Sequence, residues 1–320
     1  MTKNNKKIGG HLLADQLSAN GVDTIFCVPG ESYLGLMDGL YNHKEKIKLI
    51  TTRHESGAAN MADAYAKLTN KPGICIVSRG PGATNASNGI HTAYQDSTPV
   101  ILLIGQVSRN EREREAQQEI DYKEMFKPMA KYVAEINDAD RIPEFINKAF
   151  YISQSGRPGP VVLSLPEDML IDETTSRTTP APDIFQSSPS KTAMNSFYEK
   201  LKKAKRPIII AGGNTWTKDA VKKITQFVDH NSIPVLTSYR AQDRFDNRNE
   251  NYIGHSSYAI PIETKKRIQE SDFILALGAR LGEVTTQGYS TLKVPEPDQY
   301  LVHVHPGINE IGSVYYPDIG

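Results

Sequence analysis

The sequence predicts an α/β protein made of two doubly wound domains, each with a parallel sheet covered by helices on both faces. The first observation behind this prediction is that short continuous apolar runs alternate with helical segments along the 320 residues. Strands that alternate with helices require crossover connections, which pair the strands in parallel. The second observation is a stretch over residues 173–191 that is dense in Thr, Ser and Pro, as is typical of a surface linker. We therefore expect one domain over residues 1–172 and another over residues 192–320.

In the first domain, strands and helices are expected to alternate up to the linker. Leucines at helical spacing mark a first helix over residues 8–20, which Asn20-Gly21 closes. The next run, residues 22–28, is a buried strand that stops at Pro29-Gly30. The remaining predicted elements are strands over residues 47–52, 73–78, 99–105, 131–134 and 159–166, helices that begin at Leu34 and Glu55, and helices over residues 85–94 and 140–153.

The second domain repeats this pattern with fewer clear elements, namely strands over residues 207–211, 233–237, 273–278 and 300–304 and a helix over residues 217–230. Gly212-Gly213 follows the first of these strands and could let the backbone approach a phosphate. The alternative is a tight strand-to-helix turn, which is favoured because a full G-x-G-x-x-G pattern is absent.

Composition excludes several classes of protein. The 37 basic and 37 acidic residues cancel, so nothing favours nucleic acid or an anionic membrane surface as a partner. Cys27 and Cys75 lie in apolar runs and are expected to be buried free thiols, as in a reducing cytoplasm. The basic segment at residues 1–7 lacks the apolar core of a signal peptide, and no apolar run is long enough to span a bilayer. We therefore expect a cytoplasmic protein.

Glu55 is the most informative acidic residue of the first domain. Ala58, Met61, Ala62 and Tyr65 mark one apolar stripe of the helix that it begins, and its own side chain points along that stripe. A carboxylate against an apolar face has its pKa raised by desolvation, so that it can hold or share a proton. The alternative is an ordinary first-turn glutamate that complements the helix dipole.

Several motifs around this glutamate follow one another in a fixed order. They are Val28-Pro29-Gly30, Arg53-His54-Glu55 with the alanine-rich helix behind it, Ser78-Arg79-Gly80-Pro81-Gly82-Ala83-Thr84-Asn85 and Ser155-Gly156-Arg157-Pro158-Gly159-Pro160-Val161. The ordered set, over about residues 8–170, resembles the acetolactate synthase-like group of thiamine-diphosphate enzymes, and a weaker likeness continues to the end. The resemblance implies a pyrimidine-binding domain followed by a Rossmann-like middle domain, with thiamine diphosphate as cofactor. It also implies a homodimer or homotetramer whose active site lies at the subunit interface.

The resemblance assigns roles to individual residues. The glutamate of the family's His-Glu pair, here Glu55, hydrogen-bonds the pyrimidine ring and is the catalytic residue. A carboxylic acid at that ring promotes the imino form that deprotonates the thiazolium carbon. Pro29 and Gly30 are expected to offer backbone groups to the aminopyrimidine, and Gly82 lets the backbone approach the ring closely. Asn85 either contacts the cofactor or caps the following helix.

The segment before residue 121 is less clear. Residues 109–115 alternate in charge and are expected to be solvated. In the family, the glutamine at the position of Gln118 lies near the reactive carbon and binds beside the cofactor. An aromatic residue usually precedes it, whereas this chain has Gln117, so the substrate pocket is left open. The alternative for both glutamines is a surface helix without chemistry.

Other parts of the family's machinery are not found in the sequence. The third domain of the family carries Gly-Asp-Gly and a later Asn, which bind Mg²⁺ and the diphosphate, and no Gly-Asp-Gly occurs here. We therefore expect an incomplete middle domain, no third domain, no metal ligands, and a fragment that is inactive alone. Acetolactate synthases bind FAD in the middle domain. Arg280 is the best match for a flavin contact, but the segment between Thr237 and Gly254 is short, which leaves FAD open.

The function implied is decarboxylation of a 2-oxo acid with carboligation, as in the conversion of pyruvate to 2-acetolactate in branched-chain amino acid biosynthesis. Such an enzyme is a transferase or lyase. One alternative is a related thiamine-diphosphate lyase or decarboxylase that acts on an oxalyl thioester or glyoxylate. The other is a non-catalytic protein for nucleotide binding or subunit assembly, built from the same two folds.

Overall fold

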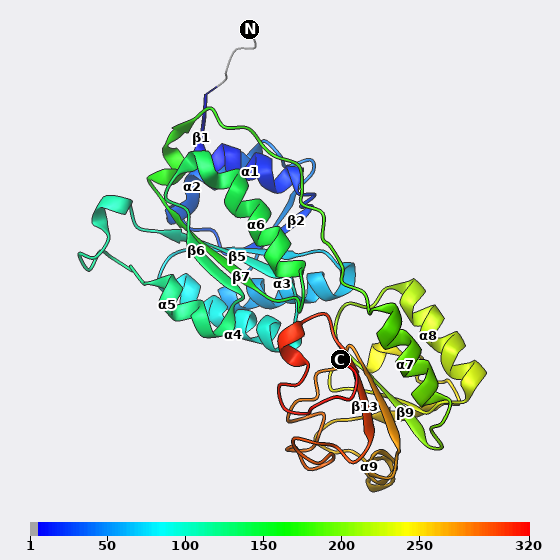
Figure 1. Cartoon of the computed structure of the whole chain (residues 1–320). Coiled ribbons are helices and arrows are strands. Elements are labelled where there is room, and N and C mark those ends of the chain that lie inside the picture. The colour runs from blue at the N-terminus through cyan, green and yellow to red at the C-terminus, as the bar shows by residue number, and fades with distance from the viewer. Residues whose placement is uncertain (1–5) are drawn as a thin grey trace. The chain divides into compact units, whose positions relative to one another are not determined.

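The computed structural model describes residues 6–320, which form two compact units separated between Phe185 and Gln186. In each unit a parallel sheet lies between helices, as the sequence predicts (Figure 1). The first five residues, which belong to the predicted first domain and its basic N-terminal segment, lie outside the described residues. None of the helices described over residues 6–320 is long and apolar enough to cross a membrane.

The sheet of the first unit has the strand order β3-β2-β4-β5-β7-β6, and every neighbouring pair is parallel. All residues of the inner strands β4, β5 and β7 are buried, because helices cover both faces. The strands are β2 (Thr24–Cys27), β3 (Lys48–Thr51), β4 (Gly73–Val77), β5 (Val100–Gln106), β6 (Tyr132–Glu135) and β7 (Val161–Pro166).

Two apolar clusters separate the helices of the first unit into layers. One cluster joins one face of the sheet to α1 (Gly9–Ala19), α2 (Leu34–Tyr41) and α6 (Ile142–Gln154). The other joins the opposite face to α3 (Glu55–Thr69), α4 (Pro81–Asp96) and α5 (Tyr122–Phe126). A separate antiparallel pair, β1 (Lys7–Ile8) with β8 (Glu173–Thr174), includes the first two residues of the predicted linker. Cys27 and Cys75 are buried free thiols, as predicted.

Helices α3 and α4 pack closely because their facing residues are small. A Cβ atom added to Gly89 of α4 would lie 2.5 Å from the Cβ of Ala59 in α3. At the C-terminal ends of the two helices, the Lys67 ammonium lies 2.7 Å from a carboxylate oxygen of Asp63 and 2.7 Å from one of Asp96. Met61 was predicted to lie on the apolar face of α3, but it is 40% exposed. The buried face of the helix consists mainly of the smaller alanines.

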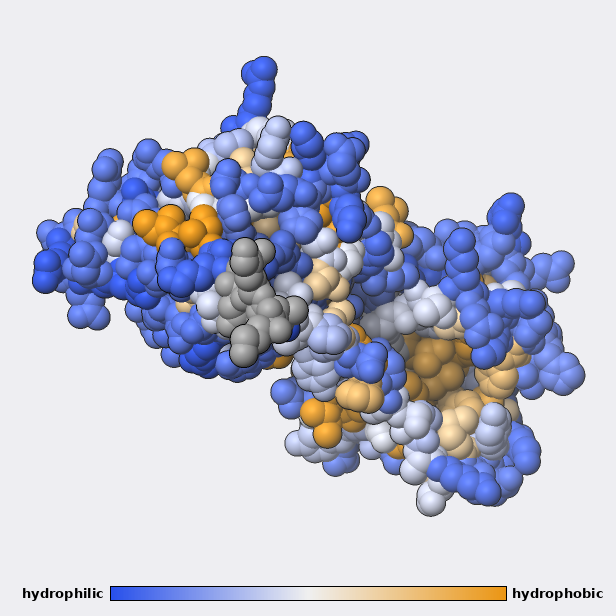
Figure 2. Space-filling view, turned by 90° about the horizontal axis from the view of Figure 1, so that it is seen from above, coloured by the Kyte–Doolittle hydropathy of each residue, from blue (hydrophilic) through white to orange (hydrophobic). Residues whose placement is uncertain are grey.

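The second unit has a five-stranded parallel sheet in the order β11-β10-β9-β12-β13. Its helices α7 (Lys191–Leu201) and α8 (Lys218–Asn231) contribute to a cluster on one face, and α9 (Ile262–Gln269) contributes to a cluster on the other. The strands are β9 (Pro207–Ala211), β10 (Val235–Thr237), β11 (Tyr252–His255), β12 (Phe273–Leu277) and β13 (Tyr300–Val304). Figure 2 shows that the surface on one side is mainly hydrophilic, with apolar residues gathered in a hollow of this unit.

The Gly212-Gly213 pair of the second unit forms a close backbone contact. A Cβ at Gly213, whose φ is +78°, would lie 2.4 Å from the carbonyl oxygen of Gly278. The next helix, α8, begins only at Lys218, so these glycines do not form a helix N-terminus that could bind a phosphate. Of the two interpretations of this pair, the tight turn agrees with the structure.

Candidate functional site

The predicted site residues of the first unit lie at one edge of its sheet. Pro29 and Gly30 follow β2, Glu55 follows β3, and the Gly80–Gly82 turn follows β4. Because these strands are parallel neighbours, their carboxyl ends meet at the same edge. Residues from three separate sequence motifs are thereby brought together.

Glu55 is the first residue of α3 and is half-buried. The preceding residue, His54, caps the helix, since its Nδ1 accepts the Ser56 N–H at 3.2 Å. The Asn85 side-chain amide donates a hydrogen bond of 2.9 Å to Oε2 of Glu55. A Cβ at Gly82 would lie 3.4 Å from Oε1. The carboxylate therefore lies against the first turns of α4, where residue 82 adds no side chain.

The start of α4 differs from the prediction. The helix begins at Pro81, not near Asn85, because proline is favoured at the first helical position, where no N–H is needed. Asn85 is consequently in the second turn, and its side chain bonds Glu55. The interpretation of Asn85 as a helix cap is wrong.

The loop after β2 contacts the end of β4 because residue 30 has no side chain. A Cβ at Gly30 would lie 2.7 Å from the Cβ of Ser78. The Ser78 hydroxyl is 2.9 Å from the hydroxyl of Ser32, which is fully buried. Pro29 itself is exposed. Ser32 was not expected from the sequence, whereas Ser78 begins the motif that contains the Gly80–Gly82 turn.

Gln118 lies in an irregular loop, so the surface helix considered for Gln117 and Gln118 is not formed. Both side chains are exposed, and Gln118 has φ +66°. Its backbone lies against the glycine-rich turn, since a Cβ at Gly80 would be 2.7 Å from the Gln118 carbonyl oxygen. The Gly80 N–H donates to the hydroxyl of Tyr122 at 2.8 Å, and burial raises the pKa of this tyrosine to about 12.

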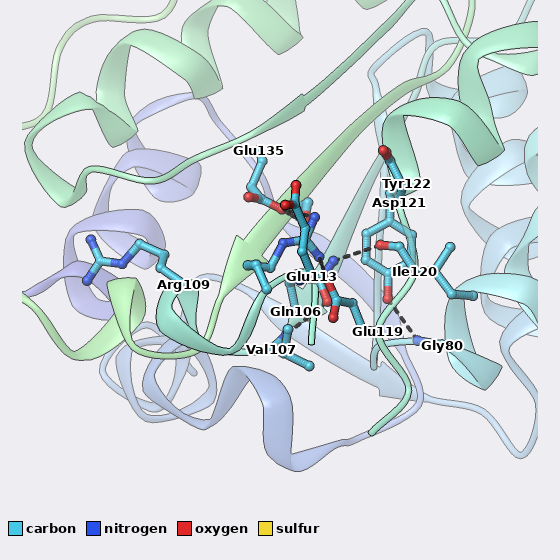
Figure 3. A network of polar contacts seen from close by, with 12 residues as sticks. Gly80, Gln106, Val107, Arg109, Glu113, Glu119, Ile120, Asp121, Tyr122 and Glu135 are labelled. Atoms are coloured by element: carbon cyan, nitrogen blue, oxygen red, sulfur yellow. Dashed lines mark hydrogen bonds and ion pairs between the residues drawn. The ribbon is translucent and has the colours of Figure 1, made fainter. Parts of the chain in front are cut away.

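The same loop is held by polar contacts that the sequence did not predict (Figure 3). Arg112, expected to be solvated, lies 3.2 Å from Oε1 of Glu119 and 3.6 Å from Oε2 of Glu135, which is on β6. Arg109 is also paired, at 2.8 Å from Asp168 and 2.7 Å from a second aspartate, Asp172. The prediction of a solvated segment over residues 109–115 is therefore wrong for these two arginines.

Arg280 lies in the other unit. Its Nε donates to Oε2 of Glu310 at 3.0 Å, and both residues line a cavity of about 90 Å³ together with the buried His303. Among residues 6–320 no group of three or more His, Cys, Asp or Glu side chains is arranged to hold a metal ion. The arrangement around Glu55 provides one acid–base group, an amide that orients it, and glycines that leave room beside it.

Comparisons with known proteins find relatives for both units. Residues 7–125 match the family described as thiamine pyrophosphate enzyme, N-terminal TPP binding domain, and residues 194–320 match the thiamine pyrophosphate enzyme central domain. The acetolactate synthase large subunit of Haemophilus influenzae is 32% identical over 306 residues, which are 93% of this chain and 52% of the relative. The corresponding subunits of Cyanidium caldarium and Lactococcus lactis are each 33% identical, over 98% and 97% of this chain and 55% and 54% of the relatives. The chain spans about half the length of these relatives.

Proposed function

Because the chain belongs to the thiamine pyrophosphate enzymes, whose N-terminal and central domains it carries, we propose that the protein acts in a thiamine-diphosphate-dependent reaction of a 2-oxo acid. The reaction is decarboxylation followed by carboligation, and pyruvate is the substrate, as the named relatives suggest. The residue that carries the chemistry is Glu55.

The observation that supports this proposal best is the hydrogen bond between Asn85 and Glu55 across α3 and α4. It fixes a half-buried carboxylate beside a glycine, where a flat heteroaromatic ring can approach without meeting a side chain. The residues present therefore fit the pyrimidine ring of thiamine diphosphate. When bound, that cofactor supplies the nucleophilic carbon and accepts the electrons left by decarboxylation.

Four residues of this chain are proposed to form its part of the active site. The Glu55 carboxyl group holds a proton at the pyrimidine nitrogen, and Asn85 keeps that carboxyl group in place. Gly30 would offer its backbone to the aminopyrimidine, and the close contact of its loop with Ser78 fixes that backbone. Gln118, which is exposed on the adjoining loop, is proposed to contact the substrate.

The remaining parts of the active site are proposed to come from outside the residues described. Mg²⁺ and the diphosphate need ligands that are not grouped among residues 6–320. We propose that a homodimer or homotetramer forms, in which another subunit faces Glu55. FAD binding in the second unit stays an open alternative, for which Arg280, paired with Glu310, is the best match for a flavin contact. Yellow colour in the purified protein would decide this point.

The test of the proposed function is Glu55→Gln, which keeps the shape of the side chain but cannot exchange a proton at neutral pH. Turnover of pyruvate by the whole protein with thiamine diphosphate and Mg²⁺ should fall by about 100-fold or more, the range for loss of a general acid–base group. The matched control is Glu45→Gln at an exposed position, which should leave turnover unchanged. Equal turnover in Glu55→Gln and the control would contradict the proposal.

A further inference from the structure

The loop between β5 and α5 has an unfavourable backbone conformation. Glu113, Glu115 and Gln118 have φ values of 61°, 55° and 66°, in the left-handed region that residues with a Cβ atom seldom adopt. Three such residues within six positions persist only when the surrounding structure fixes them. The contacts that fix this loop therefore determine where its exposed side chains lie.

The central contact is made by Arg112, whose side chain is 24% exposed. Its guanidinium group lies between the carboxylates of Glu119 on the same loop and Glu135 on β6. Oε1 of Glu119 also accepts the N–H of Glu113 at 3.0 Å, whereas the Arg112 guanidinium contacts this oxygen as an ion pair without hydrogen-bond geometry. Arg112 thus links the middle of the loop to Glu119, near the loop's C-terminal end, and to Glu135 on the sheet; Figure 3 shows these two glutamates.

A second anchor lies at the base of the loop. Gln106, the last residue of β5, is fully buried. Its side-chain amide donates to the carbonyl of Ile120 at 2.9 Å, and its Oε1 accepts the N–H of Val107 at 2.9 Å. These bonds fix the ends of the loop, whereas Arg112 is the charged side chain that fixes its middle.

Between these two sets of contacts, the backbone of the loop packs against the Gly80 turn, which borders the candidate site. A Cβ at Gly80 would lie 2.7 Å from the carbonyl oxygen of Gln118 and 2.8 Å from its Cβ. Gly80 immediately precedes α4, the helix that carries Gly82 and Asn85 beside Glu55. A change in the loop would therefore move Gln118 away from the turn that adjoins the catalytic carboxylate.

We propose that Arg112 is a positioning residue: by pairing with Glu119 and Glu135 it holds Gln118 against the Gly80 turn. Its effect on turnover rests on the proposed function, whereas its effect on the loop does not. Arg112 touches neither the cofactor nor the substrate in this proposal. It acts through the conformation of residues 112–119.

The test compares Arg112→Gln with the matched control Arg114→Gln, which removes a charge from an exposed position of the same loop. Hydrogen exchange of the 320-residue chain is measured by mass spectrometry without any ligand. Peptides covering residues 113–120 should exchange about tenfold faster in Arg112→Gln than in wild type. In the control, the same peptides should exchange at the wild-type rate. Arg112→Lys should restore part of the protection, since a lysine can pair with one carboxylate but lacks the planar fork.

Two outcomes would overturn the proposal. One is exchange of residues 113–120 within twofold of wild type in Arg112→Gln. The other is equally faster exchange throughout the first unit, which would make Arg112 a general stabilising residue. In the whole protein, Arg112→Gln should lower kcat for pyruvate about tenfold or more, and Arg112→Lys should recover part of it. Failure of the proposed function is seen separately, as full turnover in Glu55→Gln, which leaves loop exchange unchanged.

Discussion

The close packing of α3 against α4 makes Gly89→Ala an informative substitution. The new methyl group would lie 2.5 Å from the Cβ of Ala59 and 2.9 Å from its carbonyl carbon. Both helices would have to separate, because the second of these atoms belongs to the backbone and cannot rotate away. Their separation would also lengthen the hydrogen bond from Asn85 to Glu55, one turn nearer the helix starts.

The expected size of this effect follows from two opposing contributions. Overpacking of this kind costs about 2–3 kcal/mol, and an alanine in a helix interior returns about 1 kcal/mol relative to glycine. The net loss in the free energy of unfolding should be about 1–2 kcal/mol. The matched control is Gly57→Ala in α3, where the added Cβ would meet only the Cβ of Thr52 at 3.9 Å. This control should be neutral or stabilising by up to about 1 kcal/mol.

Hydrogen exchange in the peptides of α3 and α4 is the suitable assay, because it reports on the first unit alone. Exchange in Gly89→Ala should be roughly 5–30-fold faster than in wild type. Trp216 is the only tryptophan and lies in the second unit, so its fluorescence during urea unfolding provides an internal control that should not change. Exchange in Gly89→Ala as slow as in Gly57→Ala would refute the argument from close packing.

Three further predictions concern other parts of the molecule. A hydrogen bond from the Lys71 ammonium holds the pKa of Asp23 at about 2, below its unfolded value. The ionised carboxylate therefore contributes to the free energy of unfolding above about pH 4, and this contribution is lost as the pH falls through about 2. Asp23→Asn should therefore lower stability at pH 7 by less than about 1 kcal/mol, since the pair is partly exposed, and melting curves should converge between about pH 4 and 2. Gly213→Ala should destabilise the second unit by about 2 kcal/mol or more, measured by tryptophan fluorescence, because of its left-handed φ and its contact with Gly278. Cys75 is buried and burial raises the pKa of its thiol, so Ellman's reagent should react with it only after unfolding.

Each of these predictions can be contradicted by a simple result. For Gly213, the control is Gly282→Ala, where an added Cβ meets nothing within 4 Å, and equal stability of the two variants would remove the argument. For Asp23, a stability difference that persists below pH 2 would show that the substitution acts through packing. For Cys75, reaction in the folded protein would show that its strand opens readily.

The strands of the first unit could be predicted because inner parallel strands are continuous apolar runs, as in Gly73–Val77 and Val161–Pro166. The second unit was harder to predict. Helix α9 buries only Ile268, and β11 is a sheet edge of intermediate exposure, so neither gives an apolar pattern in the sequence. The expected start of α4 at residue 85 is too late, because a proline between two glycines usually indicates a turn, whereas proline also begins helices.

In the candidate site, too, some residues could be predicted from the sequence and others could not. Glu55, Gly82 and Asn85 were found because they belong to motifs that are local in sequence. The contacts of Arg112 could not be found from the sequence, because Glu135 lies on a strand 23 positions away and the fold alone brings it near. Without knowledge of these distant partners, a run of alternating charges predicts solvent exposure.

The ion pairs of Lys67 have a consequence for the opposite end of the helix pair. Lys67 joins α3 to Asp96 of α4 at one end, and Asn85 joins α4 to Glu55 at the other. Because the two helices are bonded at both ends and packed on glycine between them, these contacts oppose their separation. For the proposed function, preorganisation of this kind means that a cofactor binding at Glu55 would meet a carboxyl group already in position, so that little of its binding energy would be consumed in ordering the protein.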